Sequence, residues 1–230
     1  MTSDEPRPLP GIRAAIIDLD GTMIDTAPDF QVAINHMRAE LELAPLSLQT
    51  ITEFVGKGSE NLIRRVLGVD FEDAEVERHF DQALQRYQHH YLQINGQHST
   101  IYPDVLEGLA AMRSRGIRLA CVTNKPIAFA RPLMESAGLL DFFEVIYGGD
   151  SLPKKKPDPL PMLTVCADFG LTPDQVVAIG DSSNDAEAAQ AAGCRSLTVP
   201  YGYNHGRPVQ TIISDGIVGS LLVAAHLLAA

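Results

Sequence analysis

The chain has 230 residues and a formal net charge of −11, from 18 Lys and Arg residues against 29 Asp and Glu residues. Hydrophobic residues make up 45% and charged residues 20%, which is typical of a globular protein of one or two domains. The negative charge opposes broad binding to nucleic acid or to an anionic membrane surface, so we expect neither as a partner.

The two ends of the chain carry no pattern typical of export or membrane insertion. Residues 1–11 contain no apolar stretch after a basic start, so we expect no signal peptide and a cytoplasmic protein. The apolar segment 217–230 is shorter than the roughly 20 residues of a membrane span and predicts a packed terminal helix. Cys121, Cys166 and Cys194 have no paired spacing and are typical of reduced thiols in a core.

The first predicted element is a buried strand at residues 12–18, a short apolar run that ends in acidic and glycine residues. Residues 28–95 then show helical periodicity without strand-like alternation. Pro28 suits a first helical turn, and glycines divide the stretch into several helices. We therefore expect an inserted helical unit, with hinges at residues 24–29 and 99–104.

After residue 102, helices alternate with short apolar strands. Predicted helices cover 104–116, a segment ending at Ala137, 160–170 and 185–193, and predicted strands cover 117–124, 145–149, 176–181 and 195–200. This alternation predicts an α/β fold with a doubly wound, mainly parallel sheet that includes the first strand. The expected architecture is an α/β core of residues 1–27 and 100–230 with an all-helical cap domain of residues 28–99.

Reactive side chains occur at four predicted strand ends or the loops beside them. They are Asp18 and Asp20 in Asp-Leu-Asp-Gly-Thr, Thr123 and Asn124, Lys156 before Pro157, and Asp181 and Asp185 in Gly-Asp-Ser-Ser-Asn-Asp. Ligands bind at the carboxyl ends of the strands in such sheets, so we expect one shared site. Two carboxylates two positions apart can converge on a ligand, and a hydroxyl followed by an amide can hold an oxyanion.

In this order, the motifs resemble those of the haloacid dehalogenase superfamily, and the resemblance spans essentially the whole chain. It implies that Asp18 attacks phosphorus to form an aspartyl-phosphate. It implies that Asp20 protonates the leaving alcohol and then takes a proton from the hydrolytic water. It also implies a Mg²⁺ ion bound by the carboxylates of Asp18 and Asp181 and by the backbone carbonyl of Asp20.

The resemblance assigns the remaining motif residues to the phosphate and to the support of the site. Thr123 and the backbone N–H of Asn124 would hold phosphoryl oxygens. Lys156, which directly precedes Pro157 as in the family pattern, would neutralise both the phosphate and the nucleophile. Asp185 would orient that lysine or a metal-bound water, and a helix-capping role is the alternative.

Within the superfamily, the chain is most similar to the phosphoglycolate phosphatases. The segments that carry this similarity are the Val-Gly-x-Gly turn at 55–58, Tyr102-Pro103, Lys-Lys-Pro-Asp-Pro at 155–159, and Val-Pro-Tyr-Gly-Tyr-Asn at 199–204. The similarity implies hydrolysis of 2-phosphoglycolate to glycolate and phosphate. Met23 and Asp104 depart from the family pattern, which has Leu and Gly there, without touching the expected chemistry.

Substrate choice is expected to depend on the cap, because the core motifs treat only the phosphate. Lys57, Arg64 and Arg65 lie in or just after a glycine-rich turn and could meet the leaving group when the cap closes. The alternative is that they are solvated surface charges.

Other functions remain open on the sequence alone. A phosphatase of sugar phosphates or pyrophosphate and a beta-phosphoglucomutase-like mutase would share the core motifs. A receiver-like signalling module would also use an Asp, a Thr and a Lys, but it lacks a large cap. The expected partner is a small phosphorylated metabolite, and the chain is expected to be a monomer or homodimer.

Overall fold

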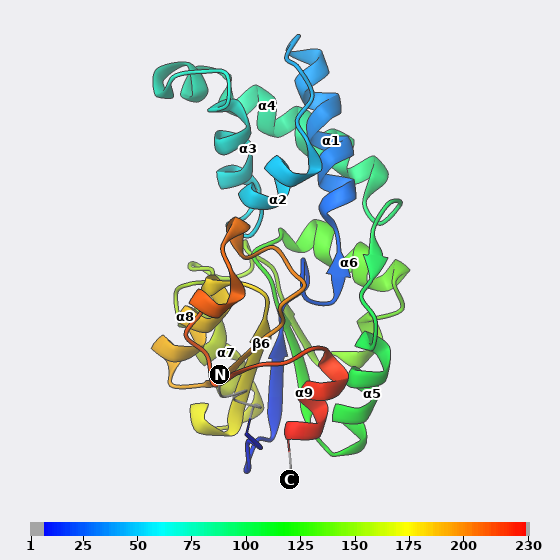
Figure 1. Ribbon diagram of the computed structural model, residues 1–230, viewed down its shortest axis with the longest axis vertical. Coiled ribbons are helices and arrows are strands. Elements are labelled where there is room, and N and C mark those ends of the chain that lie inside the picture. Colours follow the sequence, from blue (N-terminus) through cyan, green and yellow to red (C-terminus); the bar gives the residue numbers. More distant parts are fainter. Residues whose placement is uncertain (1–6, 229–230) are drawn as a thin grey trace.

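The computed structural model describes residues 7–228, which form an α/β core with a layer of helices over one end of its sheet (Figure 1). The sheet has the strand order β5-β4-β1-β6-β7-β8, and all of its pairings are parallel. Its strands are β1 (Ala14–Ile17), β4 (Arg118–Val122), β5 (Val145–Tyr147), β6 (Val176–Gly180), β7 (Arg195–Thr198) and β8 (Gly216–Ile217). The expected α/β fold with a mainly parallel, doubly wound sheet is confirmed.

Strand β1 lies in the interior of the sheet, between β4 and β6, and its side chains alternate between two apolar layers. Ala15 and Ile17 pack on one face, against helices α5 (Val105–Ser114), α6 (Ile127–Ser136) and α9 (Leu221–Leu227). Ala14 and Ile16 pack on the other face, against α7 (Leu160–Phe169) and α8 (Ser183–Ala192). Because both faces are covered, β1 is apolar throughout, and polar residues begin only where it ends.

Four helices form the layer above the sheet: α1 (Ala27–Glu40), α2 (Leu48–Phe54), α3 (Ser59–Leu67) and α4 (Asp73–Ile94). They share an apolar core of their own, which includes Ile34, Met37, Ile63 and Tyr87. Phe129 of α6 belongs to the same cluster, so the helical cap also packs on the α/β core. The helical periodicity of residues 28–95 thus corresponds to four amphipathic helices facing one another.

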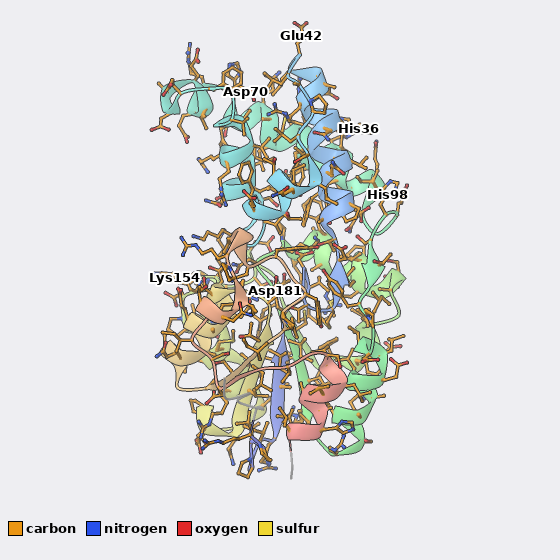
Figure 2. All side chains as sticks on the ribbon, in the orientation of Figure 1. His36, Glu42, Asp70, His98, Lys154 and Asp181 are labelled. Carbon is orange, nitrogen blue, oxygen red and sulfur yellow. The ribbon has the colours of Figure 1, made fainter. Side chains whose placement is uncertain are left out.

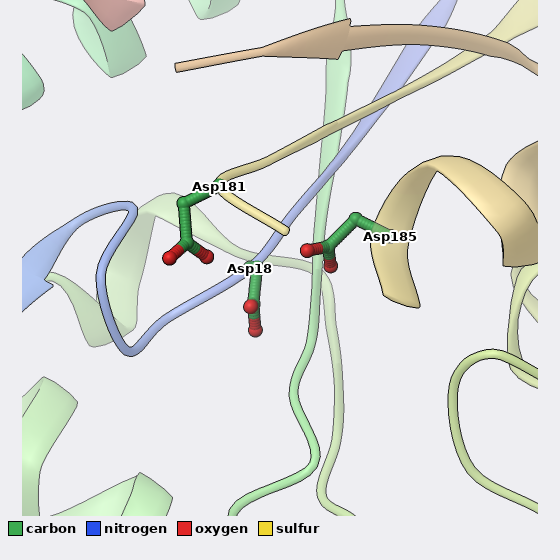
Figure 3. Close-up of side chains that lie close together, drawn as sticks. All are labelled: Asp18, Asp181 and Asp185. Carbon is green, nitrogen blue, oxygen red and sulfur yellow. The ribbon is translucent and has the colours of Figure 1, made fainter. Parts of the chain in front are cut away.

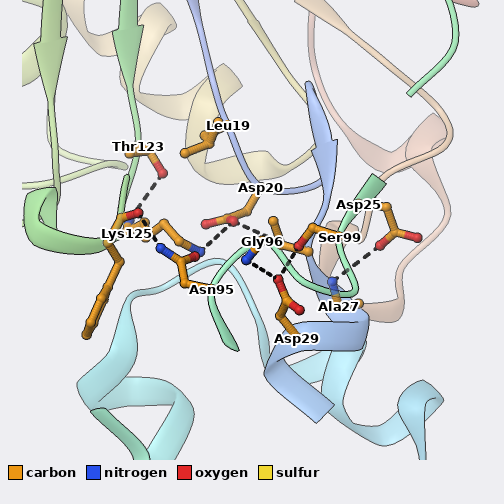
Figure 4. Close-up of polar contacts among 12 residues, drawn as sticks. Leu19, Asp20, Asp25, Ala27, Asp29, Asn95, Gly96, Ser99, Thr123 and Lys125 are labelled. Carbon is orange, nitrogen blue, oxygen red and sulfur yellow. Dashed lines mark hydrogen bonds and ion pairs between the residues drawn. The ribbon is translucent and has the colours of Figure 1, made fainter. Parts of the chain in front are cut away.

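The chain enters and leaves the cap through two adjacent segments. Strand β2 (Ile24–Asp25) pairs with β3 (Thr100–Ile101) in an antiparallel ribbon. Asp29, at the start of α1, accepts hydrogen bonds from the backbone N–H groups of Gly96 and His98, at 2.7 and 2.8 Å, and from the Ser99 hydroxyl (Figure 4). Two-residue strands are too short for sequence alternation to reveal, so only hinges were expected here.

The end of the chain differs from its prediction as a single helix over residues 217–230. Gly216–Ile217 add strand β8 to the sheet instead, and α9 covers only Leu221–Leu227. The Ser220 side chain accepts a hydrogen bond from the N–H of Val223, so the helix begins after a capping serine. Residues 229–230 of the predicted terminal helix, and residues 1–6 of the segment for which no signal peptide is expected, lie outside the described residues.

The remaining elements are short 3₁₀ turns at Leu140–Phe142, Pro173–Gln175, Asn204–Gly206 and Val209–Thr211. None of the helices within residues 7–228 combines the length and the apolar character needed to cross a membrane. Cys121, Cys166 and Cys194 are buried free thiols, and the sulfur atoms of Cys166 and Cys194 lie 3.9 Å apart.

Candidate active site

Three of the predicted site residues follow neighbouring strands. Asp18 comes directly after β1, Thr123 directly after β4 and Asp181 directly after β6. Since β4, β1 and β6 are adjacent and parallel, their carboxyl ends bring these side chains to one edge of the sheet. Figure 3 shows the carboxylates of Asp18, Asp181 and Asp185 close together: Asp18 follows β1, Asp181 follows β6, and Asp185 lies in the first turn of α8.

A buried lysine neutralises part of this acidic cluster. Lys156 Nζ lies 2.8 Å from Asp18 Oδ1 and 2.6 Å from Asp185 Oδ1, and it donates to the carbonyl of Val122 at 2.6 Å. Burial alone would lower the pKa of Lys156, but the two carboxylates outweigh burial and raise it. Lys154, two residues earlier, is exposed at the surface (Figure 2). Lys156 is thus buried in the site whereas Lys154 lies in solvent, a difference that their shared charge does not reveal in the sequence.

Asp18 is oriented through one of its two carboxylate oxygens. Its Oδ1 accepts the N–H of Leu19 at 2.7 Å as well as the contact from Lys156. The contacts of the described residues thus engage Oδ1 and leave Oδ2 without a hydrogen bond. Burial, with Asp185 and Asp181 nearby, raises the pKa of Asp18 well above its ordinary value, against the lowering effect of Lys156. A cation bound beside it would favour the ionised form.

The second carboxylate of the cluster is held by segments far along the chain. Asp181 Oδ2 accepts the N–H of Tyr203 at 2.6 Å, and its Oδ1 accepts the Thr22 hydroxyl at 3.3 Å. Gly21 has φ +81°, and a Cβ at this position would run into the Asp181 carboxylate. A glycine in the Asp-x-Asp-Gly-Thr loop is therefore required for the close approach of the two loops.

The donor set of this cluster fits a hard divalent cation. Carboxylate oxygens of Asp18, Asp181 and Asp185 lie within 4.8 Å of one another. Three carboxylates beside one lysine leave an excess of negative charge, and oxygen ligands are those that Mg²⁺ prefers. Burial, with the like charge of Asp185, raises the pKa of Asp181 to about 7. The raised pKa reflects the unfavourable free energy of placing several carboxylates together in a buried site. A bound cation would offset this repulsion.

Replacing Asp181 by asparagine should raise the stability of the metal-free protein. The pKa of Asp181 in the folded protein, about 7, lies above its ordinary value of 3.8, so ionisation destabilises the fold as the pH rises through 7. Asparagine keeps the shape and cannot ionise. In EDTA, we expect the variant to melt a few degrees higher than the wild type at pH 8, with the difference shrinking toward pH 5. A lower melting temperature at pH 8 would contradict the charge argument.

The other carboxylate of the first motif forms a separate ion pair. Asp20 Oδ1 accepts the Thr26 hydroxyl at 2.7 Å and lies 2.8 Å from Lys125 Nζ (Figure 4). The Lys125 side chain is only 2% exposed, and its ammonium group lies over the rings of Phe30 and Tyr91. Sequence reasoning missed Lys125. The available signal was its position directly after Thr123 and Asn124 at a strand end.

These two clusters border one cavity between the core and the cap. The core supplies Asp18, Asp20, Thr123, Asn124, Lys125, Asp181 and Ser182, and the cap supplies Phe30, Val55, Leu62, Tyr87 and Tyr91 among others. Polar groups thus form its floor, and apolar side chains form much of its cap side. The cavity volume is about 40 Å³, which is room for about three water molecules.

The glycine turn of the cap docks on the core beside this cavity. The carbonyl of Gly56 accepts the side-chain amides of Asn124 at 2.9 Å and of Asn184 at 3.1 Å. Asn184 also lies 3.1 Å from His205 Nε2. Burial and the charge of Lys57 lower the pKa of His205, which favours the neutral ring that can accept this bond. The sequence predicted only the backbone N–H of Asn124 as functional, whereas its side chain joins the two layers.

Replacing Gly56 by alanine should weaken this docking. Gly56 has φ +116°, and an added Cβ would lie 2.6 Å from the His205 ring. We expect a loss of about tenfold in kcat/KM on a phosphate monoester, because the cap would no longer close in register. Gly116→Ala is the matched control: its φ is +75° with no atom near the added Cβ, so it carries the backbone strain of about 1 kcal/mol alone. Equal kcat/KM losses in both variants would contradict a role for the contact.

The structure does not bring the predicted cap cations into the cavity. Arg64 pairs with Glu77 at 2.8 Å and lies over the Phe80 ring, and Arg65 donates to the carbonyl of Glu53 at 2.7 Å. Lys57 is exposed. All three are absent from the cavity lining, in the closed arrangement that the structure describes. The turn approaches the core through its backbone, so the long side chains beside it point elsewhere.

Arg64→Ala should therefore leave KM for a phosphate monoester within about twofold of the wild type, because solvated ion pairs contribute little. Steady-state kinetics of Arg64→Ala and Arg65→Ala beside the wild type would check this. A tenfold rise in KM would restore the cap-cation hypothesis.

The contacts of Asp185 fit both of its predicted roles, the positioning of Lys156 and the capping of a helix. Its Oδ1 holds Lys156, while its Oδ2 accepts the N–H of Ser182 at 3.2 Å and the Ser182 hydroxyl at 2.8 Å. The residue thus caps helix α8 and positions the buried lysine with different oxygens.

Comparison with known proteins gives a consistent result. A family model for haloacid dehalogenase-like hydrolases matches residues 15–199. The chain is 47% identical to a phosphoglycolate phosphatase of Thiobacillus denitrificans, over 95% of this chain and 96% of the relative. It is 48% identical to one of Nitrosospira multiformis, over 96% and 97%. The crystal structure of a predicted phosphoglycolate phosphatase from Haemophilus somnus superposes with a TM-score of 0.90, at 32% identity, over 94% of this chain and 98% of the other.

Proposed function

Because this chain belongs to the haloacid dehalogenase-like hydrolase family, we propose that it is a magnesium-dependent phosphatase that hydrolyses 2-phosphoglycolate through an aspartyl-phosphate. The observation that carries the proposal is that an acidic cluster and a separate carboxylate–lysine ion pair border one cavity. Asp18 lies beside Lys156 and further carboxylates, and Asp20 lies beside Lys125. Relatives named phosphoglycolate phosphatase, 47% and 48% identical, support the substrate.

The first half of the reaction would transfer the phosphoryl group to the protein. Asp18 Oδ2 attacks phosphorus, and the bond to the leaving oxygen breaks. The Thr123 hydroxyl and the Asn124 N–H bind phosphoryl oxygens, and Lys156 offsets the charge of the phosphate. Asp20 donates its proton to the leaving oxygen, so glycolate departs as an alcohol.

The second half would release phosphate. Asp20, now ionised, takes a proton from a water molecule that attacks the phosphorus of the aspartyl-phosphate. The bond between phosphorus and Asp18 then breaks, which restores the free carboxylate. Thr26 and Lys125 hold Asp20 by Oδ1 in both halves, which leaves Oδ2 for the proton.

Asp18, Asp181 and the backbone carbonyl of Asp20 would hold the Mg²⁺ ion. When bound, the ion supplies positive charge that offsets the dianionic phosphate in a chain of net charge −11. Asp185 lies in the same acidic cluster but is engaged by Lys156, so we assign it to positioning that lysine.

We infer a small leaving group from the names of the relatives. The cavity of about 40 Å³ holds only about three water molecules, so the cap must stand further from the core for any phosphate monoester to bind. We also propose that the protein acts in the cytoplasm as a monomer or homodimer on a small phosphorylated metabolite. Light scattering of the purified protein tests the oligomeric state.

The deciding experiment is phosphate release with Mg²⁺ from a panel of 2-phosphoglycolate, sugar phosphates, nucleotides and pyrophosphate, with Asp18→Asn as the blank. The comparison uses kcat/KM for each substrate. A clear preference for 2-phosphoglycolate supports the proposal. A flat profile or a preference for sugar phosphates would keep the phosphatase chemistry and overturn the substrate.

A further inference from the structure

Lys125 is a buried cation whose surroundings satisfy it only in part. An ammonium group carries three hydrogen-bond donors. Within residues 7–228, the Lys125 ammonium has one oxygen partner, Asp20 Oδ1, and otherwise faces the rings of Phe30 at 4.4 Å and Tyr91 at 4.8 Å. Aromatic faces attract a cation, but they stabilise it less than a hydrogen bond to a second anion would. The group therefore retains capacity for another acceptor within the cavity.

An anionic group on the leaving alcohol would supply this further acceptor.

The position of Lys125 matches such a group. The ester oxygen must approach Asp20, whose carboxylate is 2.8 Å from Lys125 Nζ. In 2-phosphoglycolate, a single methylene carbon separates this ester oxygen from the carboxylate. The carboxylate would therefore lie close to the lysine that contacts the acid.

Other cations do not compete for this role in the part of the chain that the structure describes. Lys57, Arg64 and Arg65 lie outside the cavity, and Lys156 is engaged by the acidic cluster on the phosphate side. His205 lines the cavity, but its imidazole accepts a hydrogen bond from Asn184. The walls near Lys125 are the apolar faces of Phe30 and Tyr91.

We propose that Lys125 binds the carboxylate of the leaving group, so that the enzyme selects phosphate monoesters whose anionic group is attached to the carbon that bears the ester oxygen, as in 2-phosphoglycolate. This inference rests on the proposed function and adds the residue that determines its specificity. Substrate recognition would then depend on a core residue beside Asp20 rather than on Arg64 and Arg65 of the cap.

The test compares 2-phosphoglycolate with ethyl phosphate, which has a methyl group in place of the carboxylate. Lys125→Met removes the charge and keeps the apolar stem. We expect the ratio of kcat/KM for the two substrates to fall by about 10- to 100-fold in this variant, because a charged hydrogen bond is lost with one substrate only. Lys154→Met, the same change at an exposed lysine, is the matched control and should keep the wild-type ratio.

The outcomes separate the inference from the proposed function. A wild-type enzyme without preference for 2-phosphoglycolate would overturn the proposed function. A wild-type preference that Lys125→Met retains, with both substrates slowed equally, would overturn the inference and show that Lys125 only positions Asp20. If Lys125→Met does not fold, Lys125→Gln, whose amide can still donate to Asp20, decides by the same ratio.

Discussion

Replacing Asp18 by asparagine is expected to reduce turnover by at least about 10⁴-fold, because the amide cannot form the phosphoryl bond. The fold should survive. Asparagine Oδ1 can still accept the N–H of Leu19, and Lys156 keeps Asp185 and the carbonyl of Val122 as partners. Because burial raises the pKa of the Asp18 carboxyl, losing it removes a charge that the metal-free fold tolerates poorly.

The measurement is phosphate release together with mass spectrometry of the acid-quenched protein for a covalent phosphoryl group. The wild type should show the added mass on the peptide that contains Asp18, and Asp18→Asn should not. Asp20→Asn is the informative companion: its turnover should also fall strongly, but it keeps the nucleophile and should still accept the label. Near-normal turnover in Asp18→Asn would show that another group attacks phosphorus.

Lys156→Met is expected to give the second largest effect, on both activity and stability. The substitution leaves Asp18 and Asp185 without their shared partner in a buried site. Breaking a buried ion pair in this way costs about 3–5 kcal/mol of unfolding free energy. We expect kcat/KM to fall by about 10³-fold, because the phosphate and the nucleophile both lose a fixed positive charge.

The pH dependence of this loss follows from the charges. The two carboxylates raise the pKa of Lys156, so the wild-type lysine stays charged throughout the neutral range and its stabilisation persists there. In the variant, the buried Asp18 carboxyl, whose pKa is already raised, takes up a proton as the pH falls, so the loss of stability should be largest near pH 8 and smaller near pH 5. Denaturant unfolding at both pH values measures this.

Lys154→Met controls for the loss of one lysine from the same segment. Its side chain is 66% exposed and lies 3.5 Å from Asp158, so its removal should change the unfolding free energy by less than about 1 kcal/mol. If both variants lost the same stability, the buried pairing would not be the cause.

Much of the site could be predicted because its reactive residues occur in short motifs at strand ends. Strands β1 and β6 are apolar on both faces, so the first polar residues come where each strand leaves the sheet. Asp18 and Asp181 lie at these two positions. Parallel pairing then brings such ends together. The helical periodicity of residues 28–95 similarly predicted an inserted helical unit, and the structure adds that its four helices share an apolar cluster.

The cap recognition hypothesis shows where this reasoning stops. Sequence spacing places Arg64 next to a glycine turn, but the direction of its side chain depends on Glu77 and Phe80, which become neighbours only when α3 packs on α4. The docking of Gly56 likewise depends on Asn124, which follows β4, and on Asn184, in the first turn of α8.

The sequence by itself determined the α/β class, the inserted helical cap and the reactive groups of the core, because periodicity and strand-end motifs are local properties of the chain. Only the tertiary structure decided which charged side chains are buried. Lys125 and Lys154 are both lysines beside polar residues, yet one contacts Asp20 under two aromatic rings and the other lies in solvent. The difference arises because burial depends on the packing of the cap over the core, which brings together residues more than 90 positions apart along the chain, as Phe30 and Lys125 are.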